Sequence, residues 1–551
     1  MTTTRGMVIV SALYWLLGMH FFMHNPGGAG LYLPFNAWGW IFASLVIALG
    51  LWQVTLRQRL VISSLQLGLW LGALLLLLPM AYPGFELKDY AISRLLGLFA
   101  GLLFLFVLYQ WQLASRARDR LLYLLLGAVA IEALLGLVQY YLLTPGNWIG
   151  YDIRANRPYG IFQQPNVMAS FMATGLALAI WLDLRGHAPP WLRGLRYGVG
   201  VLALLLLLPR LHRERLLGRV LGLVALGVAL GLASQYGMAG AKRGLEMYQS
   251  GGMRSVYWPY AARLIAEAPW TGWGYGSFES VFLQHYMADK ALNPAMVQIE
   301  YNLDHPHNEF LYWAVEGGMA PMLGMVLMGG ALLWRLGRAG IVRGGALLAL
   351  VTPILLHTQT EYPFYHAIAL WWALLLLIHV VDAEVEEEGL AGHANWREHV
   401  CRPWLLLRFA AIAIPLIVVP FMLTALHTAW VVTKYERGGY KQPALLLDIV
   451  NPMAWLTRVE FDVNAVRLMV GLQSNNKGEL EAYLDWGQGF VRHTPRANIY
   501  ANMVIALNAL GRREEADRLR AEALVLYPGE PLLTGSAARS VAATLERKPS
   551  S

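Results

Sequence analysis

Uncharged apolar runs of about 20 residues recur along most of the sequence, and this is the length that a helix needs to cross roughly 30 Å of hydrocarbon. Apolar residues make up 57% of the chain and charged residues only 14%. This pattern predicts an all-α, polytopic membrane helix bundle with about 11–12 spans. Candidate spans lie near residues 7–23, 37–56, 61–79, 91–113, 121–143, 166–184, 220–236, 311–334, 344–360, 366–381 and 404–427.

Arginines in the short loops between these runs indicate how the bundle is oriented. They gather in alternate loops, and arginine-rich short loops face the cytoplasm, so we place the amino terminus inside. This membrane signal also explains the net charge of +8 better than a nucleic-acid partner does. The inner-side arginines are Arg57, Arg59, Arg116, Arg118, Arg120, Arg185, Arg193, Arg196, Arg210, Arg213, Arg215, Arg219, Arg335, Arg338 and Arg343.

One apolar piece, residues 197–208, is too short to span the membrane. Its residues, rising about 1.5 Å each, would cover about 18 Å. If the piece did span, the arginines from Arg335 to Arg343 would face outward, against the positive-inside rule. We therefore predict a re-entrant or surface segment. This puts a large loop at 237–310, and everything after residue 428, in the periplasm of a Gram-negative cell.

Three smaller features have simple interpretations. No small-residue cleavage site directly follows the apolar run 7–23, which predicts an uncleaved first span. The single cysteine, Cys401, excludes an intramolecular disulfide framework and a cysteine-based metal site. The acidic run at 382–388 falls in the last cytoplasmic loop and predicts a solvated connection.

From about residue 430 the composition is that of a water-soluble protein. Residues 497–528 predict two amphipathic helices joined at Leu510 and Gly511, with a preceding helix at 479–492. Their Leu-Gly, Glu-Glu-Ala and terminal Pro spacing resembles a tetratricopeptide repeat. A single repeat cannot bury its own apolar face, so it must stack on earlier helices or on the membrane domain. We predict a transmembrane domain at 1–428 and a periplasmic, helical-repeat-like domain at 429–551, which is either a structural cap or a docking site.

Polar side chains that could carry chemistry gather in the outer loops, since charged groups are excluded from lipid-facing positions. Guanidinium and imidazole groups dominate there, which suits an anionic, phosphate-bearing substrate better than a metal ion. No Asp-x-Asp sequence that could hold a divalent cation occurs in these loops. The large loop contributes Arg254, Arg263, His285, His305 and His307, an earlier loop contributes Arg154, Arg157, Gln163, Gln164 and Asn166, and a third loop covers 357–366.

His307 occupies a suggestive position. Asn308 is a good N-cap for the apolar run that starts at Phe310, which would leave His307 at the positive end of that helix. The dipole disfavours the imidazolium, and a general base needs a neutral ring. The alternatives are an interfacial histidine hydrogen-bonded to backbone and a metal pair with His305, for which the sequence offers no third ligand at a recognised spacing.

Arg254 and Arg263 lie nine residues apart around Trp-Pro-Tyr. An arginine fork matches phosphate oxygens, so either residue could hold a pyrophosphate leaving group. Either could instead extend to lipid headgroups. The glycine-rich run at 272–276 predicts a tight turn, and it is no dinucleotide-binding fingerprint because no strand precedes it.

Two stretches are similar to the core of the bacterial O-antigen ligase and polymerase superfamily: R-S-V-Y-W-P-Y-A-A-R-L-I-A-E-A-P-W-T-G-W-G-Y-G-S-F at 254–278 and H-P-H-N-E-F-L-Y-W-A-V-E-G-G at 305–318. Three further features resemble the branch of pilin O-oligosaccharyltransferases. They are R-P-Y-G-I-F-Q-Q-P-N-V-M-A-S at 157–170, T-E-Y-P-F at 360–364 and the soluble C-terminal extension.

The resemblance implies en bloc transfer of a glycan from undecaprenyl pyrophosphate to a hydroxyl of pilin or another periplasmic protein. It also implies an inner-membrane enzyme whose transmembrane domain is catalytic, with inversion and without a metal or other cofactor. His307 matches the essential histidine, which would activate or orient the acceptor hydroxyl, and Arg254 matches an arginine that would contact the pyrophosphate. We assign Asn308 and Glu309 to the same catalytic group. The assigned substrate-binding residues are Arg157, Gln164, Asn166, Tyr257, Arg263, His305, Glu316 and Glu361.

The sequence departs from the family in one place and leaves other functions open. The family's mid-chain arginine has no clear counterpart in the region that begins with 197–208. Either Arg157 substitutes for it, or the chain has lost a helical pair. A ligase acting on lipid A core, a glycan polymerase, a lipid-glycan transporter and a scaffold that recruits envelope proteins are the alternatives. The polar groups cluster in outer loops without a clear twofold repeat, which argues against a transporter. The soluble tail favours a protein acceptor, and membrane lipids are expected partners.

Overall fold

The computed structural model describes residues 2–155, 157–185, 198, 252–387, 395–402 and 404–534. Within them the regular secondary structure is helical apart from one antiparallel ribbon, in which β1 (Arg59–Ser63) pairs with β2 (Trp396–Val400). Nine helices of this described part are long and apolar enough to cross a membrane. The prediction of an all-α, polytopic membrane protein is therefore confirmed.

The chain divides into two compact units, each built from separate stretches of sequence. The first comprises residues 1–73, 96–244 and 325–455, and the second comprises 74–95, 245–324 and 456–551. Wholly or mostly in the first unit are α1 (Thr3–Leu16), α2 (Phe35–Arg57), α3 (Ser64–Leu77), α4 (Ile92–Tyr109), α5 (Ser115–Tyr141), α6 (Pro165–Leu184), α13 (Met319–Gly337), α14 (Ile341–Thr358), α15 (Pro363–His366), α16 (Ile368–Glu387) and α17 (Trp404–Arg437).

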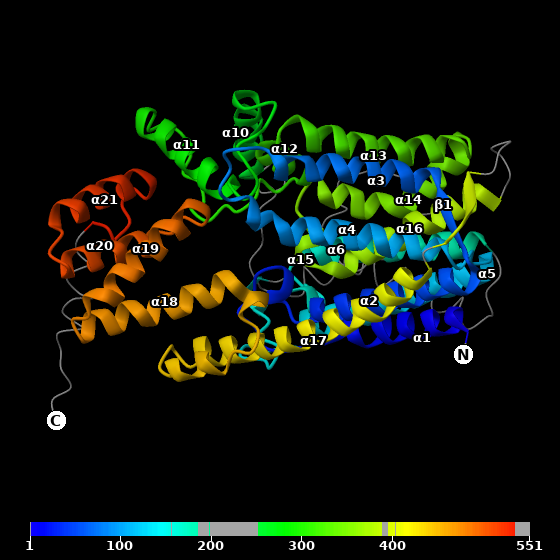
Figure 1. Cartoon of the computed structure of the whole chain (residues 1–551), viewed down its shortest axis with the longest axis horizontal. Coiled ribbons are helices and arrows are strands. Elements are labelled where there is room, and N and C mark those ends of the chain that lie inside the picture. Colours follow the sequence, from blue (N-terminus) through cyan, green and yellow to red (C-terminus); the bar gives the residue numbers. More distant parts are fainter. Residues whose placement is uncertain are drawn as a thin grey trace. The chain divides into compact units, whose positions relative to one another are not determined.

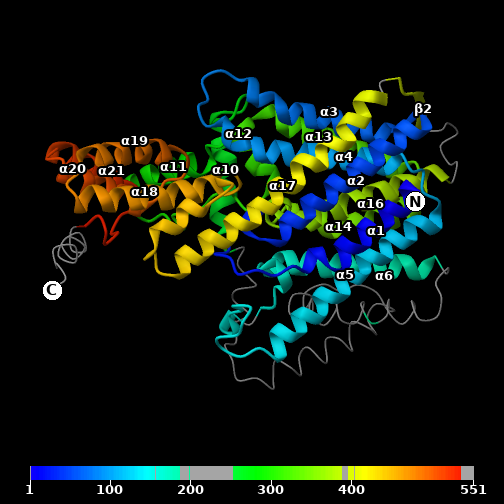
Figure 2. The same ribbon diagram turned by 60° about the horizontal axis from the view of Figure 1, so that its bottom comes forward.

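Helix α16 forms the centre of the first unit. From Ile368 to Val385 all of its residues except Trp371 are buried, so the helix is covered on every side by its neighbours. It contacts α2, α5 and α14, while α2 packs along α17 and α6 packs against α5 and α14 (Figures 1 and 2).

Two predicted spans differ from the observed helices. Helix α1 ends at Leu16, so its 14 residues cover about 21 Å and the predicted span 7–23 is not one continuous helix. The predicted span 311–334 is broken at Gly318, whose backbone lies in the left-handed region with φ +65°. A short helix, α12 (Glu309–Gly317), precedes the break, and α13 follows it.

The acidic run at 382–388 is not a solvated connection, and that prediction is wrong for its described residues, 382–387. They form the last turns of α16, where Asp382 is buried and accepts hydrogen bonds from Ser63 at 2.5 Å and Tyr109 at 2.7 Å. The reason is pairing, since a carboxylate is tolerated inside a protein when cations and donors surround it. The ion pairs are Arg335 with Asp382 and Glu386, Arg118 with Glu384 and Glu387, and Arg185 with Glu384.

The second unit contains the helical parts of the predicted large loop together with the C-terminal helices (Figure 1). The predicted helices at 479–492 and 497–528 are confirmed, and Gly511 forms the predicted turn with φ +80°. The C-terminal helices stack on one another, and two of them pack against α11, which gives their apolar faces a partner. The helices of this unit are α10 (Arg254–Glu267), α11 (Phe278–Leu292), α12, α18 (Leu456–Gln473), α19 (Lys477–His493), α20 (Ala497–Ala509) and α21 (Arg513–Leu526).

Several predictions fall outside the described residues. These are the short segment 197–208, the span 220–236, the basic loops from Arg193 to Arg219 and the first part of the large loop, 237–251.

Candidate active site

His307 lies immediately before α12, as predicted. The Asn308 side chain caps this helix by accepting a hydrogen bond from the Leu311 N–H at 2.9 Å. His307 itself has φ +53°, in the left-handed region that most side chains avoid. The cap and the turn together hold the imidazole at the positive end of α12.

Helix α10 is fastened to this turn by two consecutive aromatic residues. The Trp258 Nε1–H donates a 3.0 Å hydrogen bond to the carbonyl of Pro306. The Tyr257 ring is nearly parallel to the His307 ring, with centroids 6.1 Å apart. Arg254 is the first residue of α10 and lies three residues before Tyr257, so both project from the same side of the helix. The structure therefore brings Arg254, Tyr257 and His307 to one end of α10.

His305 completes this group from within the same loop. Its ring meets the His307 ring edge to face, with centroids 4.5 Å apart. Its Nδ1 donates to the Asp304 carboxylate at 2.5 Å, which fixes the orientation of the ring. The two imidazoles are candidate metal ligands as well as candidate bases, so the absence of a metal from the reaction stays a prediction.

Arg263 points to the other side of α10. Nine residues at about 100° each turn a side chain by about half a revolution relative to Arg254. Its guanidinium forms ion pairs with Glu267 at 2.8 Å and Asp289 at 2.6 Å. A hydrogen bond from Tyr260, together with the charge of Arg263, lowers the pKa of Asp289 below its usual value. This geometry gives Arg263 a structural role between α10 and α11, and its assignment to the pyrophosphate stays untested.

Glu316, assigned to substrate binding, is held in a buried ion pair. Its carboxylate lies 2.5 Å from the Arg94 guanidinium and also accepts the Phe278 N–H at 3.1 Å. The rings of Tyr275, Tyr312 and Trp313 surround Arg94 at 4.1–4.8 Å. These contacts give Glu316 a structural role at the end of α12.

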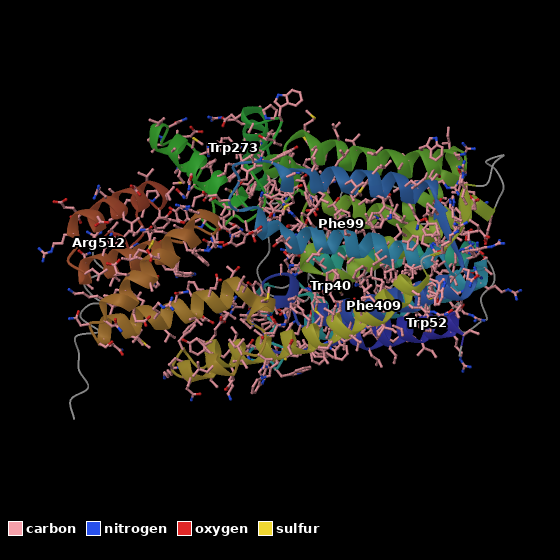
Figure 3. All side chains as sticks on the ribbon, in the orientation of Figure 1. Trp40, Trp52, Phe99, Trp273, Phe409 and Arg512 are labelled. Carbon is pink, nitrogen blue, oxygen red and sulfur yellow. The ribbon has the colours of Figure 1, made fainter. Side chains whose placement is uncertain are left out.

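The glycine-rich run at 272–276 forms the predicted turn, and it packs against the C-terminal end of α12. Gly272, Gly274 and Gly276 all have positive φ, and a Cβ on Gly272 would lie 2.5 Å from the Glu316 carbonyl. The close approach lets the N–H groups of Trp273 and Gly274 donate to the carbonyls of Val315 and Glu316, both at 2.9 Å. The Trp273 ring, labelled in Figure 3, also donates to the Leu264 carbonyl of α10 at 2.9 Å. The run therefore locks α10 to α12.

A second ion pair links the loop helices to the C-terminal helices. Arg496, at the N-cap of α20, pairs with Glu279 of α11. Burial raises the pKa of Glu279 to about 7 although the charge of Arg496 opposes it. The C-terminal helices thus belong to the same packed unit as His307.

The first unit carries its own cluster of predicted residues. Arg157 donates to the Asn166 side chain at 3.2 Å, and Asn166 donates to Glu361 at 2.9 Å. Gln164 caps α6 by accepting hydrogen bonds from the N–H groups of Asn166 and Val167. The motifs at 157–170 and 360–364, far apart in sequence, therefore meet in space.

Sequence reasoning missed the residues that hold this motif. Gln139 accepts the N–H groups of Tyr159 and Gly160, at 2.9 and 2.8 Å, and Glu132 accepts the N–H of Ile161 at 2.8 Å. His20 bonds the same Glu132 carboxylate at 2.6 Å. Both Glu132 and Arg94 could have been found from the sequence, because each is a charged residue within an apolar run. Glu132 lies in the middle of its run, and Arg94 lies near the start of another.

Three family models match parts of the sequence. The model for O-antigen ligase matches residues 193–324, which contain α10, the glycine-rich turn and the His307 loop. The model for protein glycosylation ligase matches residues 158–182, and the one for the C-terminal part of virulence factor membrane-bound polymerase matches 345–542. No curated protein matched the chain. The membrane helices and these three matches support the assignment of the chain to the superfamily of O-antigen ligases and protein glycosylation ligases, membrane enzymes that transfer glycans.

Proposed function

We propose that this protein is an O-oligosaccharyltransferase of the bacterial inner membrane. It moves a glycan en bloc from undecaprenyl pyrophosphate to a hydroxyl of a periplasmic protein such as pilin. The reaction is inverting and needs no metal. The observation that supports the proposal is the contact between the Tyr257 and His307 rings, with centroids 6.1 Å apart, at the end of α10 where Arg254 is the first residue.

His307 and Arg254 supply the two functions that the transfer requires, a base for the acceptor hydroxyl and a cation for the leaving group. The acceptor oxygen attacks the anomeric carbon of the glycan, and its proton passes to the His307 imidazole. The bond from the anomeric carbon to the phosphate oxygen breaks, and the electron pair leaves with the pyrophosphate. Arg254 stabilises the negative charge that develops on this leaving group, since a fixed cation is most effective where charge appears in the transition state.

The match to protein glycosylation ligase at 158–182 favours a protein as acceptor. Asn166 of that segment is hydrogen-bonded to Arg157 and Glu361, and the three side chains supply hydrogen-bonding groups suited to a glycan. The matches to O-antigen ligase and to a membrane-bound polymerase support a second candidate, in which lipid A core or a growing carrier-linked glycan is the acceptor.

The test is a transfer assay with purified protein, a lipid-linked oligosaccharide and candidate pilin, read as a shift of pilin on a gel. We expect the shift with wild-type protein. A carrier-linked glycan that lengthens while pilin stays unshifted would overturn the proposal in favour of a polymerase, and glycan transferred to lipid A core would favour a ligase.

His307→Asn tests the base. Asparagine tolerates the left-handed backbone of position 307 but cannot take the proton. We expect transfer to fall by about 10²-fold or more, the usual contribution of a general base. His399→Asn, at an exposed position of β2, is the matched control and should keep activity. Normal transfer by a folded His307→Asn protein would rule out the assigned role.

Arg254→Ala tests the pyrophosphate contact. We expect weaker donor binding and slower turnover, with the acceptor affinity unchanged. The control is Arg492→Ala, which removes an exposed arginine paired with Glu86 in the same unit. Unchanged donor affinity and turnover would refute the contact.

A further inference from the structure

Helix α17 is longer than the bilayer requires. Its 34 residues extend about 51 Å, whereas about 30 Å crosses the hydrocarbon. Trp404 and Trp430 lie about 39 Å apart along it, close to the thickness of a bilayer with its headgroup layers. Each ring is covered by a cation, Arg408 at 4.7 Å and Lys434 at 5.1 Å. Tryptophan with an adjacent cation is typical of the membrane interface, so α17 crosses between these two residues.

The outer face of α17 between the tryptophans is apolar and exposed. Phe409, labelled in Figure 3, is 72% exposed, and Leu416 and Ile417 are each 68% exposed. Exposed apolar side chains on a helix long and apolar enough to span the bilayer are expected to face lipid.

The chain then turns back along the same helix. After Arg437 it passes through Gly439 and Tyr440, both with positive φ, and returns. The Asn451 side chain donates to the Phe421 carbonyl at 3.2 Å and the Thr424 hydroxyl at 3.1 Å. The Thr428 hydroxyl donates to the Asn451 carbonyl at 2.9 Å. These bonds hold the returning chain beside residues 421–428. In the crossing described above, these residues lie closer to the bilayer centre than Trp430.

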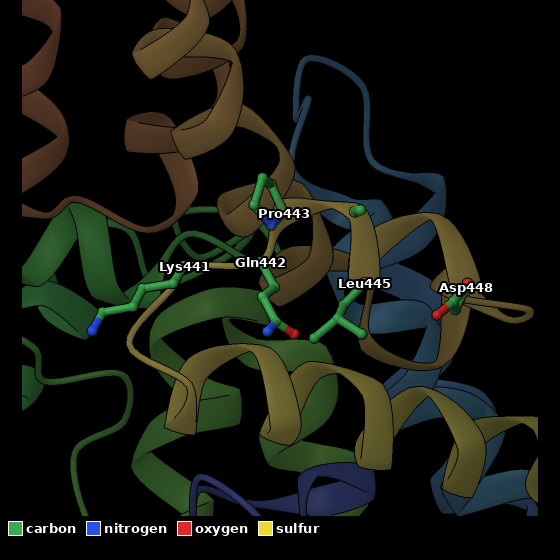
Figure 4. Close-up of a pocket in the computed structure, with 6 residues that line it drawn as sticks. Lys441, Gln442, Pro443, Leu445 and Asp448 are labelled. Carbon is green, nitrogen blue, oxygen red and sulfur yellow. The ribbon is translucent and has the colours of Figure 1, made fainter. Parts of the chain in front are cut away.

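The returning segment exposes apolar side chains at this depth. Leu447 is 87% exposed, Val450 66% and Met453 74%. Leu447 lies in the 3₁₀ turn η7 (Pro443–Asp448), Met453 lies in η8 (Pro452–Trp455), and Val450 lies in the short connection between the two turns. Figure 4 shows the start of the segment, where Lys441, Gln442, Pro443, Ala444, Leu445 and Asp448 line a shallow depression.

We propose that residues 440–453 form an interfacial anchor that inserts into the leaflet nearer Trp430. The occupant of its apolar face is lipid: Leu447, Val450 and Met453 enter the boundary between headgroups and acyl chains. Lys434, Arg437 and Lys441 lie just beyond and bind lipid phosphates, which is the charge arrangement of known interfacial segments. Two observations support lipid rather than a protein partner: continuity with the lipid-facing surface of α17, and the hydrogen bonds that fix Asn451 at bilayer depth.

The test places a fluorescent label at single cysteines. Leu447→Cys, Val450→Cys and Met453→Cys are made in a Cys401→Ala background, labelled, and reconstituted as full-length protein in phospholipid nanodiscs. Val525→Cys in α21, an apolar position that is 48% exposed, is the control. We expect a nitroxide on the upper acyl chain to quench the three labels by about twofold or more relative to the control. A water-soluble quencher should reach only the control.

Two results would overturn the anchor. The first is aqueous quenching of the three labels equal to that at position 525. The second is protection from both quenchers, which would show that protein covers the segment. Dilution in nanodiscs that hold one copy would then separate a second copy of the chain from a different partner.

Discussion

Arg94 and Glu316 form a 2.5 Å ion pair in which the side chains are only 6% and 1% exposed. The pair joins the stretch 74–95 to the helix that His307 precedes. Because both ions are out of water, each depends on the other, and removing one leaves a buried charge without its partner.

We expect Arg94→Met to lower the free energy of unfolding by about 3–5 kcal/mol. The double variant Arg94→Met with Glu316→Met should lose less than Arg94→Met alone, because no charge is then stranded. Arg492→Met, which breaks the exposed pair with Glu86, is the control and should cost less than about 1 kcal/mol. Thermal unfolding in nanodiscs measures all three, and a double variant less stable than the single one would contradict the buried-pair explanation.

Gly272→Ala should destabilise the protein far more than Gly84→Ala. Both glycines have positive φ, +64° and +83°, so each alanine carries a backbone cost of about 1–2 kcal/mol. A Cβ at position 272 would also lie 2.5 Å from the Glu316 carbonyl, whereas nothing lies within 4 Å of one at position 84. The melting temperatures of the two variants test this, and equal values would show that close packing around Glu316 contributes nothing.

Arg263→Ala separates two roles for that arginine. The ion pairs with Glu267 and Asp289 are exposed, so their loss should cost about 1 kcal/mol or less and leave donor affinity unchanged. A pyrophosphate contact would instead weaken donor binding as Arg254→Ala does. Donor affinity measured on both variants decides between the roles.

Glu279 should make stability fall as the pH rises. Burial raises the pKa of this carboxyl from 4.5 to about 7 in the folded protein. Between these values the folded state binds more protons than the unfolded chain, so the stabilising contribution present at low pH is lost as the pH rises through the folded pKa. Glu279→Gln, which cannot ionise, should flatten the dependence of the melting temperature on pH between about 4.5 and 7. Glu267→Gln, an exposed control, should not, and an unchanged slope in Glu279→Gln would refute the prediction.

Features set by neighbouring residues could be predicted from the sequence. Most spans follow from the length of apolar runs, and the cap at Asn308 follows from one side chain and the residues after it. The C-terminal helices and the turn at Gly511 were predictable for the same reason.

Features set by distant residues could not. Arg94 and Glu316 are 222 residues apart, and nothing near either one indicates its partner. Arg118 and Glu384 are 266 residues apart, so the sequence around the acidic run gives no sign of the arginines that pair with it. Helix geometry predicts that Arg254 and Arg263 point in opposite directions, but only if one helix contains both residues, as α10 does.

The buried pairs at the end of α16 have a consequence for how the protein is made. A chain is synthesised from its amino end, so Arg118 reaches the insertion machinery long before Glu384 and Glu387 exist. During that interval Arg118 lacks both partners, and in the orientation predicted from the sequence its charge helps to keep its loop on the cytoplasmic side. Once α16 enters, the two carboxylates neutralise Arg118, so this charge acts on orientation only before the chain is complete.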